Sequence, residues 1–226
     1  LLAETQISNV QTYAMPTEEQ ITDQITLTDG WCQDDDGNIT YIKGGELVQN
    51  QVLEIDGNYY GFDENGILYV NQSFNMYKSD NGVDYVMACY RAKEDGSLYV
   101  NEWFDKYYHY GENGIASSGV QEIDGKLYVF EESGHMYTYE AVAVEGGECY
   151  YCDGDGIATK MQNNEWFQTS IGYLYVKDGV VLKNCVEKIG DNWYGFMFDG
   201  RRYTDEEFSA YDKETGKNNF YRAKED

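Results

Sequence analysis

The residue types that most often carry catalysis are sparse in this 226-residue chain. Its two histidines, His109 and His135, both fall within repeated strand or turn segments. No HExxH, GxSxG, phosphate-cradling loop or Cys/His signature occurs. The 41 acidic residues are too numerous and repetitive to single out a catalytic carboxylate pair. We therefore predict no catalytic residues.

Two segments contain residue types that bind metal ions. Cys149-x-x-Cys152 has the spacing of half a zinc or redox site, but it falls on an expected strand, where residues three apart face opposite sides. We interpret both cysteines as small buried apolar residues. The acidic segments 34–38 and 153–156 lack the alternating ligand spacing of a calcium loop and are interpreted as turns. The sequence thus predicts neither a metal nor a cofactor, and the cysteines leave the redox compartment open.

Aromatic side chains are the remaining candidates for chemistry, through binding. Aromatic rings offer a flat apolar face to sugars and a negative face to ammonium groups. The chain has 23 tyrosines, and we interpret the regularly spaced series among them mainly as a stacked core. Four tryptophans break the spacing and are better candidates for ligand contact, although buried apolar area is the alternative for each. They are Trp31, Trp103, Trp166 and Trp193.

The segment Ile55–Phe74 shows which local element positions these rings. Tyr59, Tyr60 and Phe62 predict an aromatic strand. Asn-Gly between apolar strands is a strong hairpin signal, so we place a turn over residues 63–66 and a return strand over residues 67–70. A single hairpin is marginally stable and needs neighbours to cover its apolar face.

The same pattern recurs along the chain and supplies those neighbours. Turn glycines lie 18 to 30 residues apart, at Gly45, Gly66, Gly96, Gly114, Gly134, Gly156, Gly179 and Gly200. A tyrosine precedes nearly all of them by six positions, and most have an apolar residue four before and two after. A fixed period of about 20 residues indicates a solenoid. We therefore predict an all-β fold, an elongated β-hairpin repeat solenoid of about eight to nine units.

The expected array covers residues 30–226 and follows an N-terminal linker or cap over residues 1–29, in which Ile21–Leu27 could cover one open end. One long interval contains an additional strand-like segment, Gly82–Cys89. The sequence of Tyr90–Asp95 recurs unchanged as Tyr221–Asp226, again after a long interval. We therefore expect long units to alternate with short ones in an array that extends beyond this chain.

Net charge limits the partners. With a formal charge of −25, the chain is a poor ligand for nucleic acid, whose binding depends on phosphate neutralisation, and for anionic membranes. No apolar run approaches the roughly 18 residues that a membrane-spanning helix needs, so we expect no membrane insertion. The charge suits a neutral or cationic partner, and it also serves solubility.

The pattern Tyr-x-Phe-Asp-Glu-Asn-Gly-x-Leu-x-x-Asn, with Ile-Asp-Gly shortly before it, resembles the cell-wall-binding, choline-binding-type repeats of Gram-positive surface proteins. The same superfamily includes the glucan-binding repeats of streptococcal glucosyltransferases and the repetitive oligopeptides of clostridial toxins. The usual Gly or Asn five positions after the turn glycine is present at Asn50, Asn71, Asn101, Gly119 and Asn184. The mixture of long and short units is most similar to the toxin type.

This resemblance implies a β-solenoid on a secreted or surface-anchored bacterial protein that holds a glycan or wall polymer. A choline cage would need tryptophans at two positions of each unit, and this chain departs from that pattern, which counts against choline. In toxin-type arrays, glycans bind where a long unit meets the following short one, which corresponds to the segment Tyr90–Tyr110. The residues carried over by position are Tyr90, Arg91, Lys93, Trp103, Tyr108 and Tyr110.

We therefore expect a non-catalytic carbohydrate- or cell-wall-binding module whose weak sites act together. One alternative is a structural or adhesive spacer that binds a protein partner through an exposed strand edge. Another is an accessory targeting region of a larger enzyme.

Overall fold

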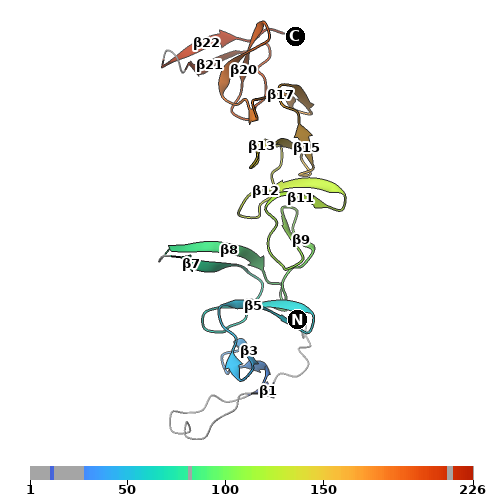
Figure 1. Ribbon diagram of the computed structural model, residues 1–226, viewed down its shortest axis with the longest axis vertical. Helices are drawn as coiled ribbons and strands as arrows, with labels where there is room; N and C mark the ends of the chain where they lie inside the picture. Colours follow the sequence, from blue (N-terminus) through green and yellow to red (C-terminus); the bar gives the residue numbers. More distant parts are fainter. Residues whose placement is uncertain (1–10, 13–27, 81–82, 213–215, 226) are drawn as a thin grey trace. The chain divides into compact units, whose positions relative to one another are not determined.

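The computed structural model describes residues 11–12, 28–80, 83–212 and 216–225 (Figure 1). Every regular element in this part of the chain is a β-strand, which confirms the predicted all-β class. The chain divides into two compact units, Leu1–Ser117 and Ser118–Asp226. We describe each unit separately.

The first unit is a series of short strands joined by tight turns. Its strands are β1 (Gln11–Thr12), β2 (Gly30–Gln33), β3 (Ile39–Lys43), β4 (Glu46–Leu47), β5 (Gln51–Ile55), β6 (Asn58–Phe62), β7 (Ser73–Asp80), β8 (Val83–Arg91), β9 (Glu102–Phe104) and β10 (Tyr108–Tyr110). They form one four-stranded sheet, β1 to β4, and three two-stranded hairpins. β1 pairs with β2 in parallel, whereas the other pairs are antiparallel. The predicted capping segment, Ile21–Leu27, lies outside the described residues.

The second unit has the same construction. Its strands are β11 (Gly119–Ile123), β12 (Lys126–Phe130), β13 (Glu140–Ala143), β14 (Cys149–Cys152), β15 (Ala158–Met161), β16 (Trp166–Thr169), β17 (Gly172–Lys177), β18 (Val180–Val181), β19 (Cys185–Ile189), β20 (Asn192–Phe196), β21 (Glu207–Asp212) and β22 (Lys217–Arg222). They form two three-stranded sheets and three two-stranded hairpins. Among the described residues of both units, no helix has the length and apolarity needed to span a bilayer.

The turn that closes the hairpin in segment 55–74 differs from our prediction. β6 pairs with the preceding strand β5, and the two are joined by Asp56 and Gly57, which have φ angles of 52° and 83°. These are the positive φ values of a turn that matches the twist of paired strands. After the predicted turn the return segment makes only one bridge, between Phe62 and Leu68, so the predicted strand over residues 67–70 was wrong.

The predicted turn residues instead form a compact four-residue turn. Gly66 N–H donates to the carbonyl of Asp63 at 3.1 Å, and Asp63 N–H donates to the carbonyl of Ile67 at 2.9 Å. The Asp63 carboxylate also accepts bonds from the amides of Asn65 and Ile67, both at 2.8 Å. Aspartate stabilises such turns because its short side chain reaches amides two to four residues ahead. The Asp153 carboxylate accepts two amide bonds in the same pattern. Turn formation therefore accounts for the acidic residue that begins segment 153–156.

Successive hairpins are joined by backbone hydrogen bonds that start, in most repeats, from the residue five positions after the turn glycine. Asn71 has a φ of 48°, and its N–H donates to the carbonyl of Lys93 in the next turn at 2.8 Å. Asn50, Asn101 and Asn184 repeat this geometry. Asparagine adopts left-handed backbone more readily than most residues. The Gly or Asn expected at this position therefore has a physical reason.

The core follows the residue four positions before each turn glycine from Gly66 onward. These seven residues are between 0% and 8% exposed and comprise Phe62, Ala92, Tyr110, Phe130, Cys152, Tyr175 and Phe196. The tyrosines two positions earlier are less uniform, because Tyr90 and Tyr150 are buried whereas Tyr173 is 40% exposed. The expected tyrosine core is therefore only partly realised.

Each unit contains one longer hairpin, β7–β8 in the first and β21–β22 in the second (Figure 1). The expected extra strand over Gly82–Cys89 is observed as β8. At the base of β7, the ring of Phe74 stacks on Tyr69 with centroids 4.0 Å apart and on Tyr90 at 5.4 Å. The second unit repeats this stack with Tyr203, Phe208 and Tyr221.

Candidate functional site

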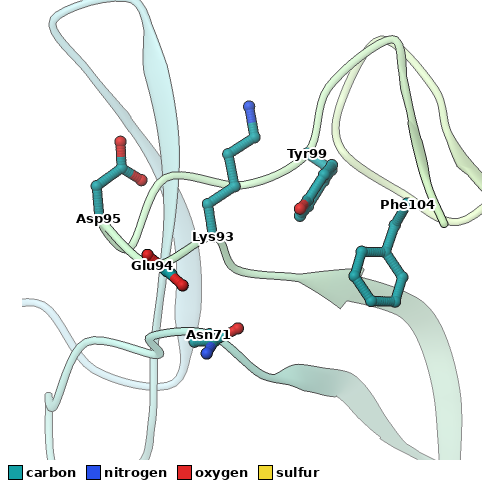
Figure 2. Close-up of a pocket in the computed structure, with 6 residues that line it drawn as sticks. All are labelled: Asn71, Lys93, Glu94, Asp95, Tyr99 and Phe104. Carbon is teal, nitrogen blue, oxygen red and sulfur yellow. The ribbon is translucent and has the colours of Figure 1, made fainter.

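A pocket of about 610 Å³ lies in the first unit, directly after the long hairpin β7–β8. Figure 2 shows the rings of Tyr99 and Phe104 on one side, the carboxylates of Glu94 and Asp95 on the other, and Lys93 between them. The residues that line it are Asn71, Lys93, Glu94, Asp95, Tyr99 and Phe104. The pocket falls at the junction Tyr90–Tyr110 that the family resemblance indicated.

Backbone hydrogen bonds fix the polar side of this pocket. Lys93 begins a four-residue turn, in which Gly96 N–H donates to its carbonyl at 3.0 Å. The Asp95 carboxylate accepts bonds from the backbone N–H and the hydroxyl of Ser97, at 2.9 and 2.6 Å. Asn71 is held against the same turn by its own bond to the Lys93 carbonyl, at 2.8 Å. The polar groups are therefore attached to a constrained backbone.

Contacts with neighbouring side chains hold the two aromatic rings of the pocket in place. The rings of Tyr99 and Phe104 meet edge to face, with centroids 5.4 Å apart, and Tyr99 also contacts the buried ring of Tyr110 at 5.9 Å. The guanidinium carbon of Arg91 lies 3.6 Å from the centre of the Phe104 ring. Arg91 also donates from Nη1 to the hydroxyl of Ser73 at 3.1 Å, which anchors it to β7. These contacts hold both rings in place before any ligand arrives.

Charge in the pocket is mixed. The Lys93 ammonium donates to Glu102 at 2.7 Å and lies 5.1 Å from the centre of the Tyr99 ring. Glu94 and Asp95 contribute carboxylates on the opposite side (Figure 2). Ammonium, carboxylate and amide groups bond well to hydroxyls, and an aromatic face contacts C–H groups. The combination suits a polyhydroxylated ligand with alternating polar and apolar surface.

The predicted residues of this junction have different positions relative to the pocket. Lys93 lines it and Arg91 supports its aromatic side. Tyr90 and Tyr110 are buried at 9% and 3% exposure, and burial raises the pKa of both hydroxyls. Tyr108 packs on Phe104 with centroids 6.5 Å apart.

The four tryptophans have different environments. Trp103 meets His109 edge to face at 5.2 Å. Trp31 packs against Tyr41 and Tyr60 in the first unit, and Trp166 packs against Tyr175 and Tyr194 in the second, with centroids between 4.8 and 5.0 Å apart. Trp193 is 68% exposed. Trp31 and Trp166 thus occupy equivalent positions of the two units, so they follow a longer period than the single hairpin.

Five lining residues were not among the sequence candidates: Asn71, Glu94, Asp95, Tyr99 and Phe104. Four of them lie inside the segment Tyr90–Tyr110, although the sequence did not single them out. Asn71 belongs to the preceding repeat. Its spacing of five residues after Gly66 recurs along the chain and could have identified it, since the residue at that position bonds to the next turn.

The cysteines of the Cys149-x-x-Cys152 segment lie on β14, as expected, and contribute to different core clusters. Both are thiols with 2% and 0% exposure. Burial raises the pKa of Cys152 to about 12 and also raises that of Cys149. A thiol that resists ionisation is a poor nucleophile, so their interpretation as buried apolar residues is confirmed.

No family model matches the chain. It is similar to two curated proteins named glucosyltransferase-S. One is from Streptococcus downei, with 25% identity over 76% of this chain, and the other is from Streptococcus mutans serotype c, with 27% identity over 84%. The chain spans only 11% and 12% of the length of these two proteins. The predicted resemblance, which included repeats of streptococcal glucosyltransferases, is confirmed by these matches.

Solved structures similar to the chain include the choline-binding domain of CbpL from Streptococcus pneumoniae, with 24% identity and a TM-score of 0.44. That match covers 80% of this chain and 89% of the other. Another is the modular autolysin LytC of the same species, with 22% identity and a TM-score of 0.40 over 74% of this chain and 36% of the other.

Proposed function

We propose that this chain is a non-catalytic carbohydrate- or cell-wall-binding repeat module of a secreted or surface bacterial protein. In this proposal residues 30–226 form an elongated β-hairpin solenoid of eight to nine units, and residues 1–29 are a linker or cap. The ligand is a neutral glycan or wall polymer, neither nucleic acid nor a lipid bilayer. The observation that carries the proposal is the pocket that combines Tyr99 and Phe104 with Lys93, Glu94 and Asp95.

Three properties of this pocket support glycan binding. Its aromatic rings are held in place by contacts within the protein, so little side-chain freedom is lost when a ligand binds. Three of its polar residues come from one constrained turn, to which Asn71 of the preceding repeat is bonded. It belongs to a repeat array, and weak sites in such an array become effective when several engage one polymer.

The other sequence candidates have secondary roles in this proposal. Trp193 is the most exposed tryptophan and offers an accessible ring face, whereas Trp103 lies within the same junction as the pocket. Trp31 and Trp166 are packed against neighbouring rings, so each presents only part of its surface. Choline is the weaker candidate ligand, because the pocket pairs its aromatic side with an ammonium group of its own.

Isothermal titration of the full chain with soluble α-glucans and wall-derived oligosaccharides tests the proposal. Tyr99→Ala removes one ring, and we expect affinity to fall roughly fivefold, because one sugar–aromatic contact contributes on the order of 1 kcal/mol. Lys93→Ala is expected to weaken binding by a smaller factor.

Lys224→Ala is the matched control. Lys224 occupies the position of Lys93 in the repeated sequence, and its carbonyl accepts the equivalent bond from Asp205 at 3.3 Å, but it does not line the pocket. We expect this variant to bind like the parent chain. Equal loss in both lysine variants would point to general electrostatics, and no response to any saccharide would refute glycan binding.

The second candidate function is a spacer that binds a protein through the long hairpin β7–β8. Tyr77, Val86 and Met87 are exposed there at 56%, 53% and 65%. Exposed apolar residues on a two-stranded hairpin with an open edge favour protein contact. If no saccharide binds, pull-downs that compare the parent chain with Tyr77→Ser/Met87→Ser test this candidate.

A further inference from the structure

The long hairpin β7–β8 packs one face against the core of the first unit and leaves its other face open. On the inward face, Phe74 and Ala88 are 8% and 9% exposed. On the outward face, Tyr77 pairs with Val86, and these side chains are 56% and 53% exposed. The Asn75 amide donates to the Tyr77 hydroxyl at 3.4 Å, as expected for residues two apart on one face of a strand.

A β-bulge adds a third apolar side chain to this outward face. Met76 pairs with Ala88 but Tyr77 pairs with Val86, so Met87 is the additional residue of the bulge. A bulge bends its strand and re-aims a side chain, and Met87 is 65% exposed. We call Tyr77, Val86 and Met87 the outward patch. Contiguous exposed apolar side chains of this kind mark interaction surfaces.

The outward patch is better suited to contact through its face than through the edge of β8. At the base of β8, the carbonyls of Cys89 and Arg91 already accept bonds from the N–H groups of Ala116 at 2.8 Å and Tyr99 at 3.1 Å. Further along, the bulge at Met87 interrupts the regular spacing that an added strand needs. A partner therefore packs on the side chains of the patch.

The second unit repeats this outward tyrosine. Tyr211 follows Phe208 by three residues in β21, as Tyr77 follows Phe74 in β7, and it is 57% exposed. Phe208 and Ala210, which alternate with it, are buried at 9% and 6%. Both long hairpins therefore present a tyrosine on the face that is turned away from their own core.

Charge indicates what can cover the outward patch. Residues 73–91 contain two basic and two acidic residues, and residues 207–222 contain three of each, so the entire formal charge of −25 lies outside the two long hairpins. A cationic partner is attracted to the acidic surfaces instead, because a neutral apolar patch gives it no charge to neutralise. Two copies of the chain repel each other over most of their surface, but not where one neutral hairpin meets another.

We propose that the outward patch of β7–β8 binds the same patch on a second copy of the chain, across a two-fold axis. In such a contact each residue pair occurs twice. Tyr77 of one copy then packs on Met87 of the other, a favourable sulfur–aromatic contact, and Val86 lies next to the axis. No residue of the patch lines the candidate glycan pocket, so the inference does not depend on glycan binding.

Sedimentation velocity of the full chain alone, without saccharide, tests this proposal. The patch is small, so we expect a weak dimer that forms as concentration rises from about 10 µM to about 1 mM. Raising sodium chloride from about 0.15 M to about 0.5 M should strengthen association at least about twofold, because salt screens the repulsion between two acidic chains and leaves the uncharged contact intact.

Charged variants at the axis test whether the partner is a second copy. Val86→Lys and Val86→Glu each place two like charges beside the axis, and each should weaken association at least about tenfold. A mixture of the two variants should recover it, because the mixed dimer contains opposite charges. Val180→Ser is the control. It removes an apolar side chain that is 58% exposed on β18, outside both long hairpins, and should associate like the parent chain.

Methyl NMR spectra of the parent chain locate the contact without any substitution, so they decide the question even where a variant does not fold. Dilution should shift the methyl resonances of Val86 and Met87 and leave those of Val180 unchanged. Any of three results would overturn the proposal: a chain that stays monomeric at about 1 mM in high salt, association that weakens as salt rises, or a dimer whose Val86 and Met87 resonances do not respond to dilution.

Discussion

At the scale of single residues, the turns depend on side chains that accept hydrogen bonds from backbone amides and on residues that tolerate positive φ angles. Asp34 accepts bonds from the amides of Asp36 and Asn38 at 3.0 and 2.8 Å, and from the Asn38 side chain at 2.9 Å. The residues that join consecutive hairpins have φ angles near those of a left-handed helix, as at Asn184 with 47°. These local requirements explain why Asp, Asn and Gly recur at fixed spacing.

The first prediction concerns Asn184. Its N–H donates to the carbonyl of Met197 at 2.8 Å, and its φ of 47° is costly for residues with an ordinary side chain. Asn184→Ala should lower the free energy of unfolding by about 1 kcal/mol, whereas Asn184→Gly should stay within a few tenths of the parent value. Urea unfolding measures both. Equal losses in the two variants would contradict the role of the backbone angle.

The second prediction concerns acid. Hydrogen bonds from the Asn38 side chain and backbone lower the pKa of Asp34 below its usual value of 3.8. Because the folded pKa is lower than the unfolded one, this group stabilises the fold above pH 3.8 and loses that contribution as pH falls through the folded pKa. Asp34→Asn should therefore be less stable than the parent at pH 5, and the difference should shrink toward pH 2.

Urea unfolding at several pH values measures this difference. Asp35→Asn removes one neighbouring exposed charge and controls for the change in net charge. A difference between parent and Asp34→Asn that grows as pH falls would contradict the assignment.

At the scale of elements, one glycine determines how each long hairpin packs on its neighbour. A Cβ at Gly61 would lie 2.2 Å from the Phe74 ring, and one at Gly195 would lie 2.1 Å from the Phe208 ring. The two glycines are equivalent in the two units. Each lets the first aromatic residue of the long hairpin lie against the backbone of β6 or β20. The base of each long hairpin is thus held by an aromatic ring that packs directly against a glycine of the preceding strand.

The third prediction tests this anchor. Gly61→Ala should destabilise the chain by roughly 1–3 kcal/mol, because the ring must move or the strands must separate. The loss should be smaller in a Phe74→Leu background, where the obstructing ring is absent. Gly111→Ala is the control, since the nearest atom to its added Cβ is 3.9 Å away. Thermal and urea unfolding of the four chains give the coupling, and additive losses would contradict the contact.

At the scale of the whole chain, acidic charge dominates. The formal charge is −25, and the hydrogen-bonded ion pairs are at the surface, such as Lys93–Glu102 with side chains 30% and 47% exposed. Exposed pairs of this kind each contribute 1 kcal/mol or less, whereas the unbalanced carboxylates repel one another throughout the fold. The balance favours a chain that is more stable when salt screens its charges.

The fourth prediction follows from this balance. Raising sodium chloride from about 10 mM to about 0.5 M should raise the melting temperature, because the Debye length falls from about 30 Å to less than 8 Å. Potassium chloride should give the same shift, since screening does not depend on which monovalent cation is used. A melting temperature that falls with salt would show that the ion pairs outweigh the repulsion.

The sequence by itself determined the all-β class, the repeated hairpins and the strand position four residues before each turn glycine from Gly66 onward. The resemblance supplied the Gly or Asn five positions after the turn glycine, whose left-handed backbone only the structure showed. These features depend on residues close together in the chain, where strand alternation and turn chemistry act directly. The same local reasoning placed the buried cysteines on opposite faces of one strand.

Only the tertiary structure decided which turn closes a hairpin and which rings meet. Asp56–Gly57 pairs β5 with β6 because its backbone twist suits two strands, whereas the turn ending at Gly66 directs the chain toward the next hairpin. The contacts of Arg202 with Trp166 and Tyr173, and of Trp166 with Tyr194, join different hairpins. Spacing fixes the face that a side chain takes on its own strand, but its partners depend on backbone bonds between residues far apart in the sequence.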